Sequence, residues 1–530
     1  MTDPLPLGPL GSDLELHRFA ELKTQLLPIY QAYLGGEASH TAVVVPSISV
    51  NQEELAKIEG SAFYEERLLF TLIRLANPLA RVIYITSQPV HQEILDYYLQ
   101  LLPGMATRAR NRLLVLSLYD GSPKPLTQKI LERPRVMERI RRFIGDPSQA
   151  YLTCYNSTVL ERRLAVELGI PLNAVDPLLL WMGTKSGSRT IFAEAGIEHP
   201  LGFENIRTRD EVVASLEKLA VARPGIRKAV VKLNESFAGE GNGVYRFPTE
   251  LPLDREERLL AIVRAMEEME WPGNRETLGG FLRKLGEMGG IVEEWVEATQ
   301  VNSPSVQMQV HPDGRLEVIS THDQVLGGST GQAYLGCRFP ADEGYRKAIL
   351  EDAEKVGQIL ADRGVLGRFG VDFVVLRNGS EPWKLYAVEI NLRMGGTTPP
   401  FMALEFLAGG RLNPETGLYE AGDGKPKFYY ATDNLKSPAY RGLLPDDLLD
   451  LMVEYRIHFR HQGLKGVLFF MIGALSQYGK LGVTAIGDSM EEAETLYEGT
   501  QDILDRIAGA TEGTFGKPRS LFEPDGARMV

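Results

Sequence analysis

"YAVEINLRMGGTTPP", residues 386–400, places an acid, an amide and a base in one short apolar run: Glu389, Asn391 and Arg393. In a β-strand, residues i and i+2 project from the same face, so these three side chains are expected to line one side of the strand. Asp372, in "GVDFVVL", reaches the same face if its strand pairs with this one across the turn "RNGSEP". The pattern predicts two antiparallel strands that carry a polar site.

The predicted site has the chemistry of a metal and phosphate site. Two carboxylates and an amide oxygen form a hard-oxygen set that suits Mg²⁺ (or Mn²⁺), whose coordination is commonly completed by substrate phosphates. Arg393 would then neutralise a transferring phosphoryl oxygen or hold a carboxylate in a bidentate pair. The alternative is a cluster of salt bridges on an exposed edge strand, which would stabilise the fold only weakly.

A lysine also interrupts an apolar strand just before a glycine-rich turn. Lys232 in "VVKLN" is costly to bury without an anion, although its long side chain could extend to the surface instead. The turn "AGEGNG" contains Gly239, Gly241 and Gly243, where backbone N–H groups can approach phosphate oxygens. The same glycines are equally typical of a plain tight hairpin, and the chain lacks a GxxxxGK[ST] phosphate loop.

Length, charge and cysteine content limit the classes of protein to which the chain can belong. The 530 residues are enough for about two to four domains, and a net charge of −13 disfavours non-specific binding to nucleic acid or to anionic membranes. The start of the chain has no signal-peptide pattern, and its most apolar window is interrupted by Arg74, Asn77 and Arg81. Cys154 and Cys337 lack metal-ligand spacing, which indicates thiols of a reducing compartment. We expect a cytoplasmic protein that binds neither nucleic acid nor a membrane.

Apolar runs that alternate with helical stretches organise the first third of the chain. Four of them, "TAVVVPS", "RVIYITSQ", "RLLVLSLYD" and "AYLTCYN", predict a parallel α/β sheet. Ligands bind beyond the carboxyl ends of such strands, so residues 86–88 and 153–156 are candidate contact loops, although polar strand ends also serve as caps. Antiparallel strands dominate the middle of the chain, and the tail from Lys465 predicts two strands and a helix.

Two further polar segments are candidates for the substrate side of the site. The run "THDQVLGGSTGQAYLG" holds His322, Asp323 and Gln324 and is expected to be a loop that faces the substrate, with an exposed connection as the alternative. Thr397 and Thr398 in "GGTTPP" lie close to where an acyl group is expected, or only form the turn into the next helix. The other histidines show no ligand spacing, so no zinc site is expected.

Taken in order over about residues 150–405, these parts resemble the ATP-grasp family of carboxylate-amine ligases. The resemblance implies two α+β subdomains that hold ATP between them. It also implies that Lys185 and Lys232 contact the phosphates, with the glycine-rich segment "SFAGEGNGVYRF" as a flexible cover.

The same resemblance assigns the remaining contacts of the nucleotide. The segment "IVEEWVEA" looks like the family's adenine-binding hinge strand and matches it at Glu293, Glu294 and Val296. Glu297 is the nearest acidic candidate for the ribose. The "VDF" aspartate and the "ExNxR" run match the magnesium ligands Asp372, Glu389 and Asn391 and the phosphate-contacting Arg393.

A narrower resemblance, to peptide ligases of the pheganomycin type, covers nearly the whole chain. It rests on "GTKSGSRTIFAEAGIEHP", "EINLRMGGTTPP" and the tail, which is also similar to the closing segment of biotin-carboxylase-like enzymes. It implies a parallel α/β pre-ATP-grasp domain over residues 1–175, an ATP-grasp domain over residues 176–405 and a small C-terminal α+β domain over residues 406–530.

By resemblance, the expected activity is ATP-dependent formation of a peptide or amide bond. A substrate carboxylate attacks the γ-phosphate of ATP to give an acyl phosphate and ADP, and an amine then displaces the phosphate. Arg393 and Lys232 would act on the transferring phosphoryl group, and the substrates would be amino acids or short peptides, in a chain compatible with a homo-oligomer. Two alternatives stay open: an ATP-grasp kinase for a small molecule, and a nucleotide-binding regulator without turnover.

Overall fold

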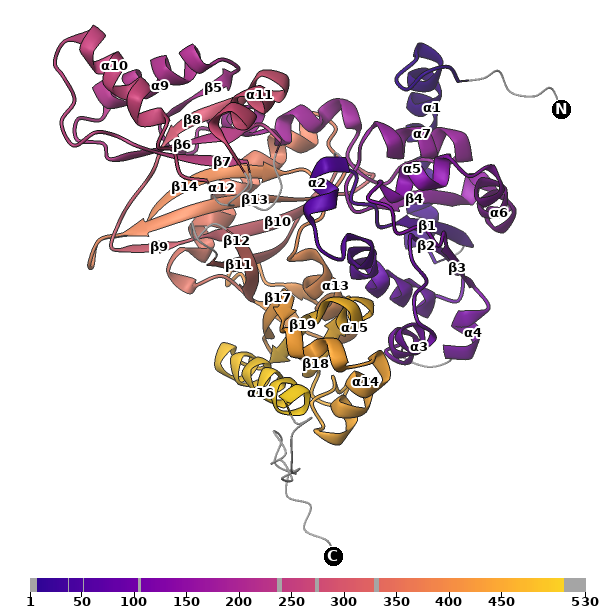
Figure 1. The fold of residues 1–530 in the computed structure, drawn as a ribbon. Helices are drawn as coiled ribbons and strands as arrows, with labels where there is room; N and C mark the ends of the chain where they lie inside the picture. Colours follow the sequence, from indigo (N-terminus) through magenta and orange to yellow (C-terminus); the bar gives the residue numbers. More distant parts are fainter. Residues whose placement is uncertain are drawn as a thin grey trace, which may run out of the picture.

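The structure is a computed structural model that describes residues 7–36, 38–50, 52–102, 106–235, 241–271, 276–327 and 333–509. Figure 1 shows an N-terminal part built on a parallel sheet, a smaller sheet with its own helices, and a large sheet that continues into the C-terminal part. The combination of an α/β part with α+β parts confirms the fold class predicted from the sequence.

Four parallel strands form the N-terminal sheet in the order β3-β2-β1-β4, and they are the four apolar runs expected. β1, β2 and β4 are buried along nearly their whole length because helices cover both faces of the sheet. The strands are β1 (His40–Val45), β2 (Ala80–Thr86), β3 (Leu113–Ser117) and β4 (Ala150–Cys154). The helices are α1 (Asp13–Leu34), α2 (Gln52–Lys57), α3 (Gln92–Gln100), α4 (Ala106–Arg110), α5 (Leu126–Leu131), α6 (Pro134–Ile144) and α7 (Val159–Leu168).

The helical stretch between β1 and β2 is a long 3₁₀ helix, η1 (Ser61–Ala76), that buries three consecutive charged residues. Glu65 accepts hydrogen bonds from the amide and the hydroxyl of Ser87, and Glu66 accepts one from the amide of Gly473 at 3.0 Å. Buried charges need such partners. These contacts fix η1 between the N-terminal sheet and the C-terminal part, and they place the third charged residue, Arg67, beside the site described below.

A second sheet has four antiparallel strands in the order β5-β8-β6-β7. Its strands β6 and β7 form the hairpin expected around the glycine-rich turn, with Lys232 opposite Asn242. The elements are β5 (Gly202–Ile206), β6 (Lys228–Leu233), β7 (Asn242–Arg246) and β8 (Gly290–Glu294), packed against α9 (Arg209–Ala222), α10 (Arg255–Met266) and α11 (Leu278–Met288).

The large sheet has the order β14-β13-β10-β11-β12-β17-β19-β18, with β9 paired to β13, and all of its pairs are antiparallel. η3 (Pro177–Gly183), α8 (Lys185–Ala195) and α12 (Glu343–Asp362) pack against its first strands. The strands are β9 (Gln300–Asn302), β10 (Pro304–Val310), β11 (Leu316–Gly327), β12 (Ala333–Phe339), β13 (Gly367–Arg377), β14 (Lys384–Asn391), β17 (Phe428–Lys436), β18 (Gly466–Phe470) and β19 (Lys480–Gly487).

The C-terminal part continues this sheet instead of forming a separate one. Residue 405, the expected domain boundary, lies inside α13 (Thr398–Ala408), which packs against η1. One apolar cluster joins N-terminal strands, α13 and the C-terminal strands. The remaining elements are η2 (Pro147–Gln149), β15 (Gly410–Leu412), β16 (Tyr419–Ala421), η4 (Pro438–Gly442), α14 (Pro445–Glu454), η5 (Ile472–Ala474), α15 (Leu475–Tyr478) and α16 (Met490–Gly509).

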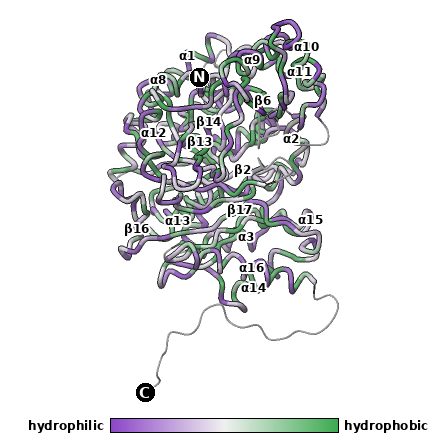
Figure 2. The backbone as a smooth tube through the Cα atoms, turned by 90° about the vertical axis from the view of Figure 1, so that its left-hand side faces the viewer, coloured by the Kyte–Doolittle hydropathy of each residue, from purple (hydrophilic) through white to green (hydrophobic). Residues whose placement is uncertain are grey.

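Figure 2 shows apolar and polar residues mixed along the described part of the chain. Within the described ranges, no helix has the length and apolar character that crossing a membrane requires. Cys154 and Cys337 are buried and form no disulfide, and burial raises the pKa of the Cys337 thiol to about 12. Both cysteines are therefore unreactive core residues.

Candidate active site

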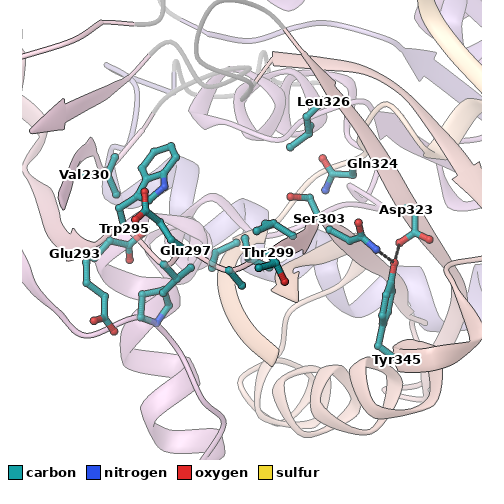
Figure 3. Close-up of a pocket in the computed structure, with 18 of the residues that line it drawn as sticks. Val230, Glu293, Trp295, Glu297, Thr299, Ser303, Asp323, Gln324, Leu326 and Tyr345 are labelled. Atoms are coloured by element: carbon teal, nitrogen blue, oxygen red, sulfur yellow. Dashed lines mark hydrogen bonds between the residues drawn. The ribbon is translucent and has the colours of Figure 1, made fainter. Parts of the chain in front are cut away.

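A cavity of about 1100 Å³, here called the nucleotide cavity after the role that the sequence resemblance implies, lies between the antiparallel four-stranded sheet and the large sheet (Figure 3). One side is formed by β6 and by the segment that follows β8, and the other by β11 and α12. Tyr345 on α12 donates a hydrogen bond to Asp323 at 2.6 Å and accepts one from Asn302 at 3.1 Å. The cavity therefore has one wall that is fixed by polar contacts.

The segment after β8 presents both main-chain groups and carboxylates to the nucleotide cavity. Among the described residues, the backbone N–H and C=O of Val296 make no hydrogen bond, so they can pair with a ligand. The Glu294 carboxylate accepts from the amide of Leu201 at 2.9 Å and pairs with Arg223 at 2.9 Å. Glu297 pairs with Lys228 and Arg227, and the Lys228 contact holds its pKa below the usual value.

Glu293 is buried and its carboxylate is already in use. It pairs with Lys232 at 2.5 Å and with Arg189 at 3.1 Å. Of the predicted hinge residues, Glu293 therefore has its carboxylate committed to two cations, and its side chain fixes the position of Lys232.

A second cavity of about 440 Å³, here called the reaction chamber, adjoins the nucleotide cavity. The two cavities share the wall residues Lys232, Ser303, Gln324, Leu326, Val374 and Val388. The predicted residues Lys185, Asp372, Glu389, Asn391 and Arg393 all line the reaction chamber. The structure thus brings together residues that lie more than two hundred positions apart in the sequence.

The register of β13 and β14 places the predicted carboxylates side by side. Asp372 lies opposite Glu389, and Asn391 lies opposite Gly370. The Asn391 amide donates to Asp372 at 3.0 Å and accepts from Arg393 at 2.7 Å. The four side chains form one connected polar cluster, as the alternation in the sequence predicts.

The electrostatics of the two carboxylates differ. Burial, reinforced by the charge of Glu389, raises the pKa of Asp372 to about 7. Burial opposes the charged form of Glu389 too, but Lys185, Arg393 and Lys232 outweigh it and hold its pKa below the usual value. A cation bound between these two adjacent carboxylates would reduce their mutual repulsion and favour the ionised form of Asp372.

The donor set fits a magnesium ion better than a metal held by the protein alone. Within the described part of the chain, no group of three or more His, Cys, Asp or Glu side chains is placed to hold a metal. The chamber offers two carboxylates and one amide, so a metal there would need phosphate or water oxygens as well, which is the usual coordination of Mg²⁺.

The two predicted lysines line the reaction chamber from different elements, Lys185 from α8 and Lys232 from β6. Lys185 is the first residue of α8, whose N-terminus is held by Asn234: its main-chain oxygen accepts from Lys185 N at 3.2 Å and its side chain from Ser186 N at 3.0 Å. The Lys185 ammonium pairs with Glu389. α8 is further fixed to β14 because Ser188 accepts from the amide of Ile390 at 3.0 Å. Lys185 therefore lies against the strand carboxylates, whereas Lys232 pairs with Glu293 at the edge shared by the two cavities.

The glycine-rich turn lies only partly in the described structure. Gly239 is outside the described residues, and Gly241 accepts a backbone hydrogen bond from Leu233 at 2.9 Å. At Gly243 a Cβ would lie 2.6 Å from Met269 and 2.7 Å from Trp271. Close packing thus explains the glycine at position 243 without any phosphate.

His322 corrects one expectation from the sequence. Neither alternative, a loop that faces the substrate or an exposed connection, holds for it, because it lies within β11 and is fully buried. Its Nε2 hydrogen-bonds the Tyr429 hydroxyl at 2.6 Å, and burial lowers its pKa to about 3. The two residues that follow His322 do line the cavities. Asp323 and Gln324 line the nucleotide cavity, and Gln324 also lines the reaction chamber.

The other polar segments serve mainly as turns and caps. Thr398 accepts from the amide of Gly395 at 3.0 Å at the start of α13, whereas Thr397 lines the reaction chamber. The Thr86 hydroxyl donates to the Gln88 carbonyl at 2.7 Å, and the Asn156 side chain pairs with the backbone of residue 49. The strand ends are therefore capped, as the alternative from the sequence states.

One wall of the reaction chamber was missed by the sequence reasoning. This wall, here called the Arg67 wall, is formed by η1, by the residue just after β4, and by β17 and β19. Its residues are Tyr64, Arg67, Tyr155, Asp433 and Lys480. Nothing in the local sequence sets these residues apart, because a charged run at the start of an apolar helix is ordinarily a solvated face. Only the three consecutive charges before "LLFTLI" gave a weak signal.

Comparison with known proteins places these features in a family. A family model described as IQCH-like, ATP-grasp matches residues 178–249 and 263–415, and one described as PGM1 C-terminal domain matches residues 447–500. The L-propargylglycine–L-glutamate ligase of Streptantibioticus cattleyicolor is 30% identical over 473 residues, which are 88% of this chain and 94% of that protein.

Two more distant matches agree with these. The IQ motif-containing protein H of Danio rerio is 22% identical over 428 residues, which cover 72% of this chain and 40% of that protein. Among solved structures, a β-γ-ATP complex of biotin carboxylase from Campylobacter jejuni matches with a TM-score of 0.51 and 10% identity, over 88% of this chain and 95% of that chain. At that identity the match supports the fold.

Proposed function

Because the chain belongs to the ATP-grasp carboxylate-amine ligases and is an ATP-dependent C–N ligase, we propose that it joins an amino acid or short peptide to an amine. The donor carboxylate attacks the γ-phosphate of ATP to give an acyl phosphate and ADP, and the amine then displaces phosphate to form the amide. The name of the Streptantibioticus cattleyicolor relative states that it joins two amino acids, which supports small amino-acid substrates here.

The observation that carries the proposal is the reaction chamber itself. Asp372 and Glu389 face each other on adjacent strands, and the ammonium of Lys185 lies against Glu389. Lys232 belongs to both cavities, so a nucleotide along the β8 segment would have its phosphates directed into the chamber. Phosphoryl transfer requires positioned cations and no protein nucleophile, and this is what the chamber offers.

Asp372, Glu389 and Asn391 would hold Mg²⁺, and such an ion neutralises the charge that develops on the transferring phosphoryl oxygens. Arg393 and Lys232 would contact those oxygens from the protein side. The backbone of Val296 and the neighbouring Glu293 and Glu294 would hold the adenine ring. Glu297 remains the candidate for the ribose, although Lys228 and Arg227 already pair with it.

The test is incubation with ATP, Mg²⁺ and pooled L-amino acids and short peptides, followed by mass spectrometry and measurement of ADP release. Condensed products whose mass equals the two substrates minus water, formed together with ADP, are the expected result. A phosphorylated product without condensation would contradict the ligase proposal and identify a kinase. ATP binding without any ADP release, across the pool, would identify a regulator.

A further inference from the structure

Arg67 is a buried guanidinium held between two aromatic rings. Its side chain is only 3% exposed, and its Cζ lies 4.4 Å from the ring centroid of Tyr64 and 4.3 Å from that of Tyr155. Two cation–π contacts therefore hold the guanidinium, and its N–H groups remain the atoms that can make hydrogen bonds. The orientation of Arg67 is fixed before any ligand binds.

The edge of this guanidinium is not fully used by the protein. Nε donates to the carbonyl of Tyr64 at 3.3 Å, and Nη1 lies 3.5 Å from the Asp433 carboxylate. Nη2 has no hydrogen-bond partner among the described residues, although it is buried. An unsatisfied N–H of a buried charged group carries a substantial free-energy cost, so it indicates a missing acceptor.

A second cation, Lys480, and one carboxylate, Asp433, lie close to Arg67. Lys480, buried at the start of β19, donates to the Tyr64 hydroxyl and lies 4.7 Å from the Tyr64 ring. The Arg67 wall thus presents two cations and one carboxylate to the reaction chamber. An α-amino acid carries the complementary groups, a carboxylate and an ammonium on one carbon.

The Arg67 wall is also joined to the phosphoryl-transfer side of the chamber. The carbonyl of Tyr155 accepts from the amide of Met394 at 3.1 Å, and Met394 directly follows Arg393. A molecule held against Tyr155 therefore lies beside the segment that would contact the acyl phosphate. That is the position an attacking amine must occupy.

We propose, building on the proposed ligase function, that the Arg67 wall binds the amine substrate and that this substrate is an α-amino acid. Its carboxylate accepts from Nη2 of Arg67 and lies near Lys480, while its amino group lies near Asp433. Arg67 is a substrate-binding residue that determines specificity for a free carboxylate, and it takes no part in phosphoryl transfer. An amine without that carboxylate is a poor substrate.

The experiment compares acids with amides in the amine position. The wild-type enzyme receives ATP, Mg²⁺, a donor that condenses in the pooled assay, and either the L-amino acid that it joins or the corresponding L-amino acid carboxamide. We expect kcat/KM to be at least tenfold lower for the carboxamide. Arg67→Gln should raise the KM of the amino acid at least tenfold and remove the preference for the acid, while the KM values of ATP and of the donor change less than twofold.

Two further variants separate binding from structure. Arg67→Lys, which keeps the charge, should restore part of the preference for the acid. Arg74→Gln is the matched control, since Arg74 lies on the same helix, hydrogen-bonds the Tyr151 hydroxyl and does not line the chamber. It should leave the acid-to-amide ratio unchanged.

The outcomes distinguish this inference from the proposed function. Condensation with equal kcat/KM for acid and carboxamide would overturn the role of the Arg67 wall and leave the ligase proposal intact. The wild-type comparison decides this even if Arg67→Gln fails to fold. Absence of any condensed product would overturn the ligase proposal and this inference together.

Discussion

The reaction chamber has two sides whose cations are paired differently: the side proposed to bind the nucleotide, here called the nucleotide side and formed by Lys185, Lys232, Glu389 and Asp372, and the Arg67 wall. On the nucleotide side, Lys185 pairs with Glu389 and Lys232 pairs with Glu293. On the Arg67 wall, the one carboxylate, Asp433, is 3.5 Å from Nη1, and Nη2 of Arg67 has no partner among the described residues. Each lysine of the nucleotide side therefore has a carboxylate partner, whereas the Arg67 wall keeps an unused hydrogen-bond donor, Nη2 of Arg67.

This difference indicates two modes of binding. A metal and phosphates that arrive together can exchange with ion pairs already present, so little charge is left unpaired at any stage. A single amino acid brings both of its charges on one carbon, and a guanidinium whose Nη2 is open would recognise its carboxylate directly. The predictions below test each side of that contrast.

The largest effect is expected at Glu389. Glu389→Gln removes a proposed magnesium ligand and the partner of Lys185, and should lower kcat by roughly 10²- to 10³-fold. ADP release under saturating substrate measures this. Glu351→Gln, on the exposed face of α12, is the control and should keep wild-type kcat. Full activity of Glu389→Gln would contradict the assignment of the metal site.

A smaller effect is expected at Lys232. Lys232→Met removes a proposed phosphate contact, while Glu293 keeps Arg189 as a partner at 3.1 Å, so the fold should survive. The affinity for ATP should fall roughly tenfold to a hundredfold. Calorimetric titration with ATP and Mg²⁺ measures it, with the exposed Lys355→Met as control. Unchanged affinity would show that Lys232 serves only to neutralise Glu293.

Gly243 separates phosphate binding from packing on the nucleotide side. Gly243→Ala places a methyl group against Met269 and Trp271, which should lower the free energy of unfolding by about 1–3 kcal/mol. The KM of ATP should stay within twofold of wild type. Thermal or denaturant unfolding and ATP kinetics give both values, and a large rise in KM with unchanged stability would restore the phosphate role.

The smallest effect is expected at His322. Like Arg67, it has a buried nitrogen, Nδ1, without a hydrogen-bond partner among the described residues. Unlike Arg67, it lines neither cavity. Its pKa is about 3 in the folded chain against 6.5 for an ordinary histidine. The unfolded state therefore binds more protons between these values, and stability rises with pH across that window.

The stabilising contribution of neutral His322 is fully present above pH 6.5 and is lost as the pH falls. At pH 5.5 this contribution to the free energy of unfolding should be smaller by about 1 kcal/mol than above that window. Denaturant unfolding of the wild type and of His322→Gln at both pH values isolates this contribution. An equal pH dependence of the two proteins would contradict it, as would a raised KM for the amino acid in His322→Gln.

The relative placement of the acidic strand residues was predictable from the sequence because it follows strand periodicity. Asp372, Glu389 and Asn391 alternate on two strands joined by a short turn, and this local pattern determines which residues face each other. The four strands of the N-terminal sheet were visible for the same reason, as short apolar runs bounded by turns. Resemblance to a family then supplied Lys185 and the β8 segment.

The Arg67 wall could not be predicted in this way, because it depends on contacts between distant segments. Arg67 and Lys480 are more than four hundred residues apart, and η1 brings them together through buried charges whose partners lie elsewhere in the chain. The error at His322 has the same origin. A polar run after a strand looks like a loop until the pairing of β11 with β10 and β12 buries it.

The most direct test of the proposed mechanism follows the oxygen atoms of the donor carboxylate. The donor found in the pooled assay is labelled with ¹⁸O in its carboxylate and incubated with ATP, Mg²⁺ and the amine substrate. An acyl phosphate predicts one ¹⁸O atom in each phosphate released for each amide formed. Condensed product accompanied by unlabelled phosphate would contradict activation of the carboxylate by ATP in this chamber.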